Sequence, residues 1–154
     1  MKTLARFYLL ALPAIAADRV IVGNVVGVHD GYTLTLRTFN ETLKVLLFGI
    51  DTPKLGQPFG NNAEQVLSQM VFGKSVTISS TGKDRYGRTL GTVFSQDKDN
   101  VNAELVRMGM AWHYRKYSNS TARQGFEDYA RANRIGLWAD PNPIATWDWW
   151  KGKR

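Results

Sequence analysis

Residues 84–94, with the sequence DRYGRTLGTVF, decide the fold of this protein. The first half of this stretch is polar and contains a glycine, which predicts a loop. The second half, residues 89–94, is rich in β-branched and aromatic side chains, which predicts a strand. Another strand is predicted at residues 76–78, so the two strands flank a charged loop over residues 81–88.

Three more strands are predicted before this pair. β-branched residues indicate a strand at 20–28, the turn signal Asp30-Gly31 precedes a strand at 33–36, and residues 42–50 form a third. The third strand should end at Asp51-Thr52-Pro53, because proline cannot donate a hydrogen bond to a sheet.

Helices are predicted where apolar residues recur at helical spacing, at residues 61–73, 102–108 and 121–134. The last should have Phe126 and Tyr129 on its apolar side. Five strands with interspersed helices predict an α+β fold that is mainly β, a five-stranded OB-fold barrel with about three helices. Two aromatic residues, Trp112 and Trp138, are expected in the core.

The composition excludes several kinds of catalytic and metal site and favours one class of binding partner. The chain has 154 residues, which fits one domain. It has no cysteine and only two histidines, which excludes disulfides, a thiolate nucleophile and Cys-ligated zinc, and argues against a His-based metal site. Its 20 Lys and Arg against 13 Asp and Glu give a formal net charge of +7. Such an excess favours a polyanionic partner, nucleic acid before anionic membranes or glycans.

The N-terminal residues have the order of a secretory signal peptide: two basic residues, an apolar run and the small-residue pattern Ala14-Ile15-Ala16. We expect a signal peptide at residues 1–17, the folded domain at 18–140 and a Trp/Lys-rich tail at 141–154. The alternative for the first segment is a buried helix.

Two expectations follow for the location of the protein. It should be secreted or periplasmic after removal of the signal peptide. Stable membrane insertion is not expected, because the apolar run is shorter than the ~20 residues that span a bilayer.

The loop and strand at residues 84–94 resemble the second signature of the staphylococcal nuclease (thermonuclease) family over their whole length. Further motifs of that family occur in its order and approximate spacing: Asp30-Gly31-x-Thr33-Leu34, Gly49-Ile50-Asp51-Thr52-Pro53, residues 101–109 and Gly136-Leu137-Trp138. The resemblance covers residues 20–140. It implies an OB-fold barrel with three helices and calcium-dependent cleavage of DNA and RNA to 3′-phosphates.

In that family two aspartates and a threonine carbonyl hold one Ca²⁺ ion, two arginines bind the scissile phosphate, and a glutamate acts as general base or positions water. The resemblance places the second calcium aspartate at Asp51, the threonine at Thr52 and a catalytic, phosphate-binding arginine at Arg88. These residue types suit the chemistry, because Ca²⁺ prefers oxygen ligands and phosphoryl transfer needs cations where charge develops.

The other three family positions are substituted. Tyr32 stands at the first calcium aspartate, Leu46 at the second arginine and Lys54 at the general base. Leu46 cannot donate a hydrogen bond to phosphate. Lys44, on the same predicted strand face, can supply a charge but not the bidentate fork of arginine. Such changes in an intact scaffold are compatible with natural divergence or with deliberate editing of an active parent.

The substitutions predict a catalytically impaired nuclease with weak or lost Ca²⁺ binding. A positioned general base contributes about 10²- to 10⁴-fold to a rate, and one preorganised donor about 10²- to 10³-fold. Asp51 remains the one carboxylate among the matched ligands, with Lys54 close by. The exchanges make the site more positive than the family pattern, so we expect metal-free binding of DNA or RNA. The Tyr32 ring offers a surface on which a base could stack, and the alternative for it is an exposed loop aromatic.

Interleaved basic and aromatic residues in two segments are typical of proteins that bind single strands with little sequence preference. The residues expected to bind nucleic acid are Arg88, Lys44, Lys54, Lys83, Arg85, Tyr86, Tyr114, Arg115, Lys116 and Tyr117. The alternatives are solvated basic loops and, for Arg88, a structural ion pair with Asp84. We expect the protein to be a monomer.

Two other functions stay open at this point. One is an active, secreted Ca²⁺-dependent endonuclease with a rearranged site, whose hydrolysis Arg88→Ala should abolish. The other is a non-enzymatic interaction protein of the cell envelope, whose barrel and tail bind a protein or glycan and whose association is insensitive to salt.

Overall fold

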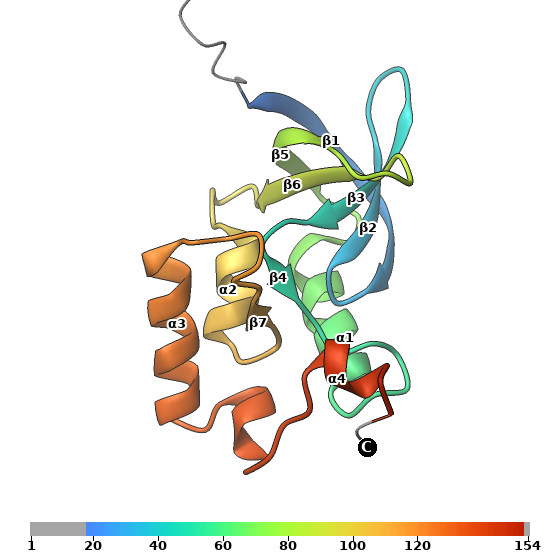
Figure 1. Cartoon of the computed structure of the whole chain (residues 1–154). Coiled ribbons are helices and arrows are strands. Elements are labelled where there is room, and N and C mark those ends of the chain that lie inside the picture. Colours follow the sequence, from blue (N-terminus) through green and yellow to red (C-terminus); the bar gives the residue numbers. More distant parts are fainter. Residues whose placement is uncertain (1–17, 153–154) are drawn as a thin grey trace, which may run out of the picture.

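The computed structural model describes residues 18–152 (Figure 1). The signal peptide predicted at residues 1–17 lies outside the described residues and stays a prediction. Within residues 18–152, no helix has the length and apolar composition needed to cross a membrane.

Five strands close into a barrel: β1 (Arg19–Asp30), β2 (Thr33–Arg37), β3 (Thr42–Leu47), β5 (Ser75–Lys83) and β6 (Thr89–Phe94). Their order is β1-β2-β3-β6-β5, and pairing of β1 with β5 closes the barrel. The neighbours are antiparallel except β3 and β6, which run parallel. The arrangement confirms the predicted OB-fold, an α+β fold that is mainly β.

The predicted third strand is interrupted before its expected end. The chain turns at Phe48 and Gly49 after β3, and a separate strand, β4 (Ile50–Asp51), then pairs with β7 (Trp112–His113). Gly49 has a φ angle of 77°, a left-handed conformation that favours glycine and ends the pleat. The prediction of one continuous strand was therefore wrong, because β4 leaves the barrel and lies below it in Figure 1.

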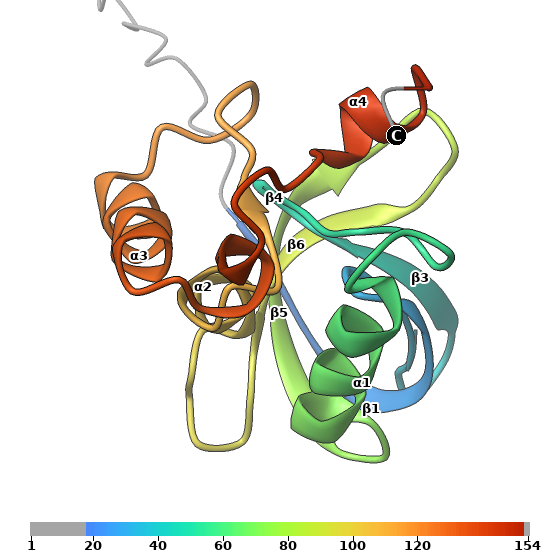
Figure 2. The ribbon, with the colours of Figure 1, turned by 90° about the horizontal axis from the view of Figure 1, so that it is seen from below.

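The three predicted helices are present as α1 (Gly60–Val71), α2 (Val101–Arg107) and α3 (Thr121–Ala132). α1 packs against β1, and α2 packs between β6 and α3, as seen from below in Figure 2. A 3₁₀ helix (Gly136–Ala139) and a fourth helix, α4 (Thr146–Trp149), follow.

One helix presents a different face from the one we predicted. α3 turns Arg123, Glu127 and Ala130 inward, so Tyr129 is 54% exposed and its predicted place on the apolar side was wrong. Phe126 packs against the core as expected. The inward face of α3 is thus partly charged, which apolar periodicity does not reveal.

The core has two clusters of buried side chains. The larger fills the barrel and the space beneath α1 and α2. The smaller contains Trp112 and Trp138, which confirms the prediction for both, with ring centroids 6.1 Å apart. This smaller cluster packs β7 against α3 and the 3₁₀ helix at Gly136–Ala139.

Buried Asn102, on α2, fixes the turn that carries the chain out of the barrel. Its amide group donates to the Phe48 carbonyl at 3.0 Å and to the Gly91 carbonyl at 3.1 Å. Its side-chain oxygen accepts from the Val93 N–H at 3.0 Å. One side chain therefore satisfies three buried backbone groups of β6 and the β3–β4 turn.

The tail segment, defined as residues 141–150, folds back onto the protein. Trp147 packs on Trp112 with 6.1 Å between ring centroids. The Thr146 hydroxyl donates to the Thr52 carbonyl at 2.8 Å. The segment therefore covers the loop after β4 and holds it in place.

Candidate functional site

The predicted site lies where the β1–β2 turn meets the loop after β4. Gly31 permits this approach, because a Cβ atom at this position would lie 2.7 Å from Thr52 Oγ1 and 2.7 Å from the Cβ of Ala63. The Asp30 carboxylate shapes the turn by accepting the backbone N–H of Tyr32 at 3.0 Å. The turn thereby presents Tyr32 to the neighbouring loop.

Lys54 on that loop binds Tyr32 directly. Its ammonium group donates a hydrogen bond to the Tyr32 hydroxyl and lies 3.8 Å from the centroid of the tyrosine ring. A cation over an aromatic face is attracted by the ring quadrupole. The loop itself is closed by Gln57, whose side chain accepts the Lys54 N–H at 3.3 Å and whose N–H donates to the Lys54 carbonyl at 2.9 Å. Two of the substituted residues are therefore in contact.

Burial shifts the pKa values of three groups here. It raises the pKa of Asp51 to about 6, against the lowering effect of the Lys54 charge. It lowers the pKa of Lys54, while Asp30 and Asp51 act in the opposite direction. Burial, together with the charges of Asp51 and Asp30, raises the pKa of the Tyr32 hydroxyl far above its usual value. The phenol is therefore neutral at physiological pH.

Arg88 reaches this site while it is held within its own loop. Its Nε donates to Asp84 Oδ2 at 2.6 Å, and its backbone N–H donates to Asp84 Oδ1 at 2.9 Å. The guanidinium interacts electrostatically with Tyr32 and Lys54. The structural ion pair with Asp84 is thus present, but the side chain is 33% exposed, and five N–H donors leave room for a phosphate contact.

The oxygen atoms of this site do not fit a Ca²⁺ ion. Among residues 18–152, no group of three or more His, Cys, Asp or Glu side chains could hold a metal. The Thr52 carbonyl already accepts the Thr146 hydroxyl, and Asp30 Oδ1 already accepts the Tyr32 N–H. The Lys54 ammonium interacts with both Asp30 and Asp51. Ca²⁺ takes six to eight oxygen ligands, some of them waters, and a cation that already interacts with both aspartates opposes the approach of another.

The third substituted residue, Leu46, lies on the outward face of β3. It pairs with Thr33 of β2 and with Leu90 of β6, two positions beyond Arg88. Lys44 is exposed on the same face, as the sequence predicted, since the alternate residues of β3 are buried. An apolar side chain therefore stands beside the Arg88 loop where the family pattern has a second arginine.

One group of predicted nucleic-acid-binding residues lies on the β5–β6 hairpin. Lys83, Arg85 and Tyr86 are exposed there, and the Arg85 guanidinium lies 4.9 Å from the Tyr86 ring centroid. Arg88 approaches the same ring at 5.6 Å. The hairpin thus places cations and one aromatic ring beside the candidate site.

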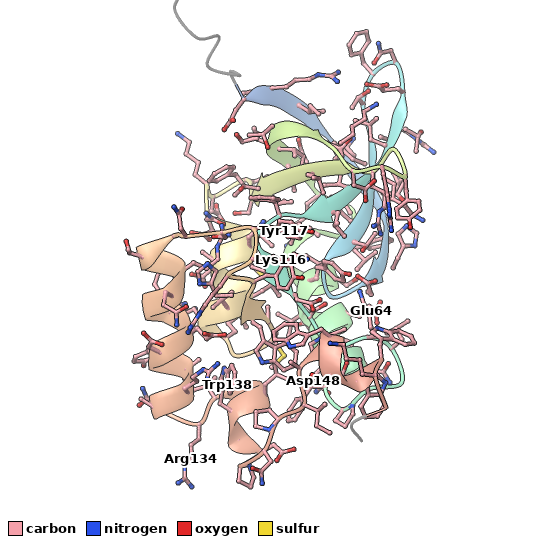
Figure 3. All side chains as sticks on the ribbon, viewed as in Figure 1. Glu64, Lys116, Tyr117, Arg134, Trp138 and Asp148 are labelled. Carbon is pink, nitrogen blue, oxygen red and sulfur yellow. The ribbon has the colours of Figure 1, made fainter. Side chains whose placement is uncertain are left out.

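The second group follows β7. Tyr114 and Tyr117 have ring centroids 5.2 Å apart, and the Lys116 ammonium lies 5.6 Å from the Tyr117 ring. In Figure 3, Lys116 and Tyr117 lie near β4, between the barrel and α3. The Tyr114 N–H donates to the Gly49 carbonyl at 3.0 Å, and its phenol interacts electrostatically with Tyr32. This group therefore borders the candidate site at Tyr114.

Sequence reasoning missed three residues that build the site. Asp30 was predicted as a turn residue, and the Asp-Gly pair was the available signal for its position. Gln57 and Thr146 make hydrogen bonds to residues 87 and 94 positions away in the chain, the carbonyls of Ile144 and Thr52. No local pattern marks such distant contacts.

The chain thus forms a closed OB-fold barrel with acidic, basic and aromatic residues gathered at its β1–β2 turn. Residues 44–140 match the family described as "Staphylococcal nuclease homologue". The chain belongs to the staphylococcal nuclease family.

Related proteins support this assignment over most of the chain. A protein named "Uncharacterized endonuclease" from Haemophilus influenzae is 45% identical over 126 residues, 81% of this chain and 70% of its own. "Micrococcal nuclease" from Shigella flexneri is 38% identical over 161 aligned residues, 92% of each chain. "Staphylococcal-like nuclease CAN1" from Arabidopsis thaliana is 38% identical over 131 residues, 82% of this chain and 40% of its own.

Proposed function

We propose that this protein is a nuclease-like, nucleic-acid-binding member of its family whose hydrolytic activity is strongly impaired and whose Ca²⁺ binding is weak or lost. The contact between the Lys54 ammonium and the Tyr32 phenol carries this proposal. It places a tethered cation and a neutral phenol at two positions that are acidic in the family pattern.

Two groups that hydrolysis needs are missing from such a site. A protonated Lys54 cannot take a proton from water, so the general base is missing. Leu46 supplies no charge to the scissile phosphate. Removing a base costs about 10²- to 10⁴-fold and removing one charge-stabilising donor about 10²- to 10³-fold, although such effects do not simply multiply.

Binding of DNA or RNA has separate support. The centre of the site is not strongly positive, because Asp30 and Asp51 face Lys54, and Asp84 pairs with Arg88. The attraction for phosphates comes instead from the exposed cations around it: Lys44, Lys83, Arg85, Arg115 and Lys116. Their interleaving with Tyr86, Tyr114 and Tyr117 suits a single strand.

A second candidate is an active Ca²⁺-dependent endonuclease, and the names of two relatives favour the nuclease activity itself. For either function we propose secretion or export to the periplasm, on the basis of the N-terminal sequence. We also propose that the protein acts as a monomer.

Hydrolysis of denatured DNA, assayed with Ca²⁺ and with a chelator, tests the proposal. Arg88→Ala is purified in parallel to expose any contaminating nuclease. We expect both proteins to hydrolyse DNA equally and only at the background level. We also expect the parent to bind single-stranded DNA without metal.

Calcium-dependent cleavage by the parent that disappears in Arg88→Ala would instead establish the active endonuclease. Arg88 would then act together with residues that replace the three missing groups of the family pattern. A silent parent that also fails to bind DNA and RNA at low salt would leave the envelope interaction protein as the remaining function.

A further inference from the structure

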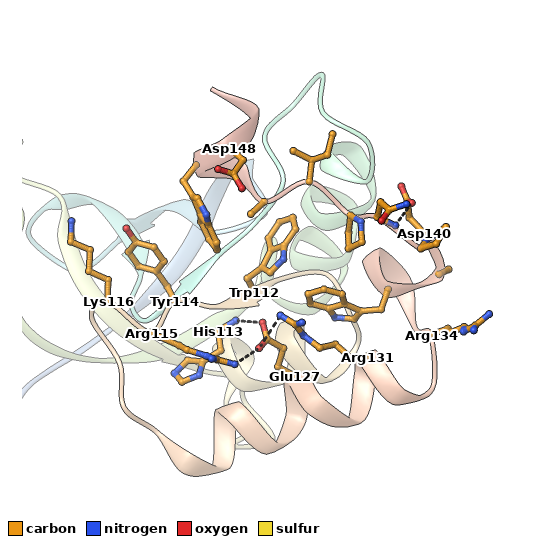
Figure 4. A pocket seen from close by; sticks show the side chains of 18 residues that line it. Trp112, His113, Tyr114, Arg115, Lys116, Glu127, Arg131, Arg134, Asp140 and Asp148 are labelled. Atoms are coloured by element: carbon orange, nitrogen blue, oxygen red, sulfur yellow. Dashed lines mark hydrogen bonds and ion pairs between the residues drawn. The ribbon is translucent and has the colours of Figure 1, made fainter. Parts of the chain in front are cut away.

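A groove with a volume of about 1160 Å³ lies beside the candidate site (Figure 4). Its walls are β7 with the loop that follows it, one side of α3, and the chain from Trp138 through the tail segment. Pockets for small molecules have volumes of ~300–1000 Å³. A groove that is larger and open suits a length of polymer better than a single small ligand.

Two arginines in this groove share one buried carboxylate. Arg115 and Arg131 each place a terminal nitrogen 3.6 Å from Glu127 Oε2. The Glu127 side chain is 2% exposed, whereas the arginine side chains are 66% and 50% exposed. The carboxylate is therefore buried beneath the two guanidinium groups, which remain open to solvent in the groove. A guanidinium has five N–H donors, so one carboxylate contact leaves donors for phosphate oxygens.

The arginine pair is also fixed in position. Glu127 accepts the His113 N–H at 3.2 Å and the Gln124 amide at 3.1 Å, which anchors the shared carboxylate. The Arg131 guanidinium lies 4.1 Å from the centroid of the Trp138 ring. Side chains that are ordered before binding lose less entropy when a ligand arrives.

An aromatic surface lies on the other side of the groove. Trp147 is 40% exposed and lies 5.7 Å from the ring of Tyr114. It is supported from behind by Trp112, which is buried. An exposed ring with rigid support is a stacking surface for an unpaired base.

The groove is continuous with the candidate site. Tyr114 lines the groove, and its N–H donates to the carbonyl of Gly49, which directly precedes β4 and Asp51. At the first turn of α4, the Thr146 hydroxyl binds the Thr52 carbonyl. A strand that leaves the site at Tyr32 would therefore meet Tyr114 and Trp147 before it reaches the arginine pair.

We propose that this groove binds the continuation of the single-stranded nucleic acid held at the candidate site. Arg115 and Arg131 contact successive phosphates, Tyr114 and Trp147 stack an unpaired base, and Arg134 at the far end meets the departing backbone (Figure 4). The proposal rests on the proposed function and adds to it a direction and a length for the bound strand.

Fluorescence anisotropy with a labelled trinucleotide and a labelled dodecanucleotide, at low salt with EDTA, tests this extended site. The parent is compared with the double variant Arg131→Gln/Arg134→Gln. The matched control is Arg19→Gln/Lys74→Gln, which removes the same charge from exposed positions on β1 and after α1, away from the groove residues. Circular dichroism of each variant verifies that it is folded.

The expected result is a loss of affinity that depends on the length of the oligonucleotide. The groove variant should bind the dodecanucleotide roughly tenfold more weakly than the control, with a log–log salt slope that is smaller by about 1.4 for two lost phosphate contacts. Trinucleotide binding should match that of the control. A duplex of the same length should compete poorly, because its bases are not free to stack.

Four results would overturn the proposal. Equal binding of the dodecanucleotide by groove and control variants would exclude the groove from the nucleic-acid site. Equal competition by the duplex would exclude base stacking. If the parent binds neither oligonucleotide, the proposed function itself fails, whereas length-independent binding by the parent refutes the extended groove alone.

Discussion

In the candidate site, the Lys54 ammonium contacts the Tyr32 phenol where the family pattern has two carboxylates. The combined variant Tyr32→Asp/Leu46→Arg/Lys54→Glu restores an acid, an arginine and a base. It should gain Ca²⁺-dependent hydrolysis of denatured DNA by at least about 10⁴-fold, since each restored group contributes about 10²-fold or more. Initial rates measure the gain. The same variant with Arg88→Ala is the control, and equal rates in both would contradict the assigned roles.

The buried carboxyl group of Asp51 predicts how the stability of the protein depends on pH. Its pKa in the folded protein is raised to about 6 by burial, from an ordinary value of 3.8. Between these values the native state binds more protons than the unfolded state, so the parent loses stability as pH rises from 4 through 6. Asp51→Asn removes this loss. The free energy of unfolding of Asp51→Asn, minus that of the parent, should therefore increase by up to about 3 kcal/mol from pH 4 to pH 7.5.

Urea denaturation at both pH values measures this change. Asp97→Asn, at an exposed position, is the control and should show little change with pH relative to the parent. A parallel pH dependence for Asp51→Asn and its parent would contradict a raised pKa for Asp51.

At the scale of elements, the tail segment and the loop after β4 stabilise each other. Thr146→Val removes the hydroxyl that donates to the buried Thr52 carbonyl at 2.8 Å. The free energy of unfolding should fall by about 1–3 kcal/mol, because the carbonyl is left without that donor. Denaturant unfolding checks the loss. Thr42→Val, on exposed β3 surface, is the matched control, and equal stability of the two variants would contradict the role of Thr146.

For the whole molecule, the net charge of +7 predicts how binding responds to salt. The logarithm of the affinity for single-stranded DNA should fall linearly with the logarithm of salt concentration, with a slope of about −0.7 for each contacted phosphate. The affinity should be the same in Ca²⁺ and in EDTA. Anisotropy titrations at several salt concentrations measure both. Salt-insensitive binding, or binding that requires calcium, would contradict the proposed function.

Local patterns in the sequence were sufficient for most of the barrel. Alternating residues at 33–36 and 89–94 predicted β2 and β6, and the family motifs predicted that five strands close into an OB-fold. The break after β3 was missed, because the strand-like residues of 42–50 conceal the left-handed conformation of Gly49.

The candidate site was predictable as a set of positions but not as a set of contacts. The family pattern identified Tyr32 and Lys54 as substituted residues, yet only the folded chain shows that they bind each other. The groove was less predictable still. Glu127 and Arg131 lie four residues apart on α3, but the contact of Glu127 with Arg115 depends on how α3 packs beside β7.

The hydrogen bond between Thr146 and Thr52 joins residues 94 positions apart. Ribosomes make roughly 5–20 residues per second, so the tail segment emerges a few seconds after Phe94 completes the barrel strands. A chain that ended before Thr146 would lack this donor, and the Thr52 carbonyl in the loop after β4 would lose its cover. The loop at the candidate site therefore depends on one of the last segments that the ribosome makes.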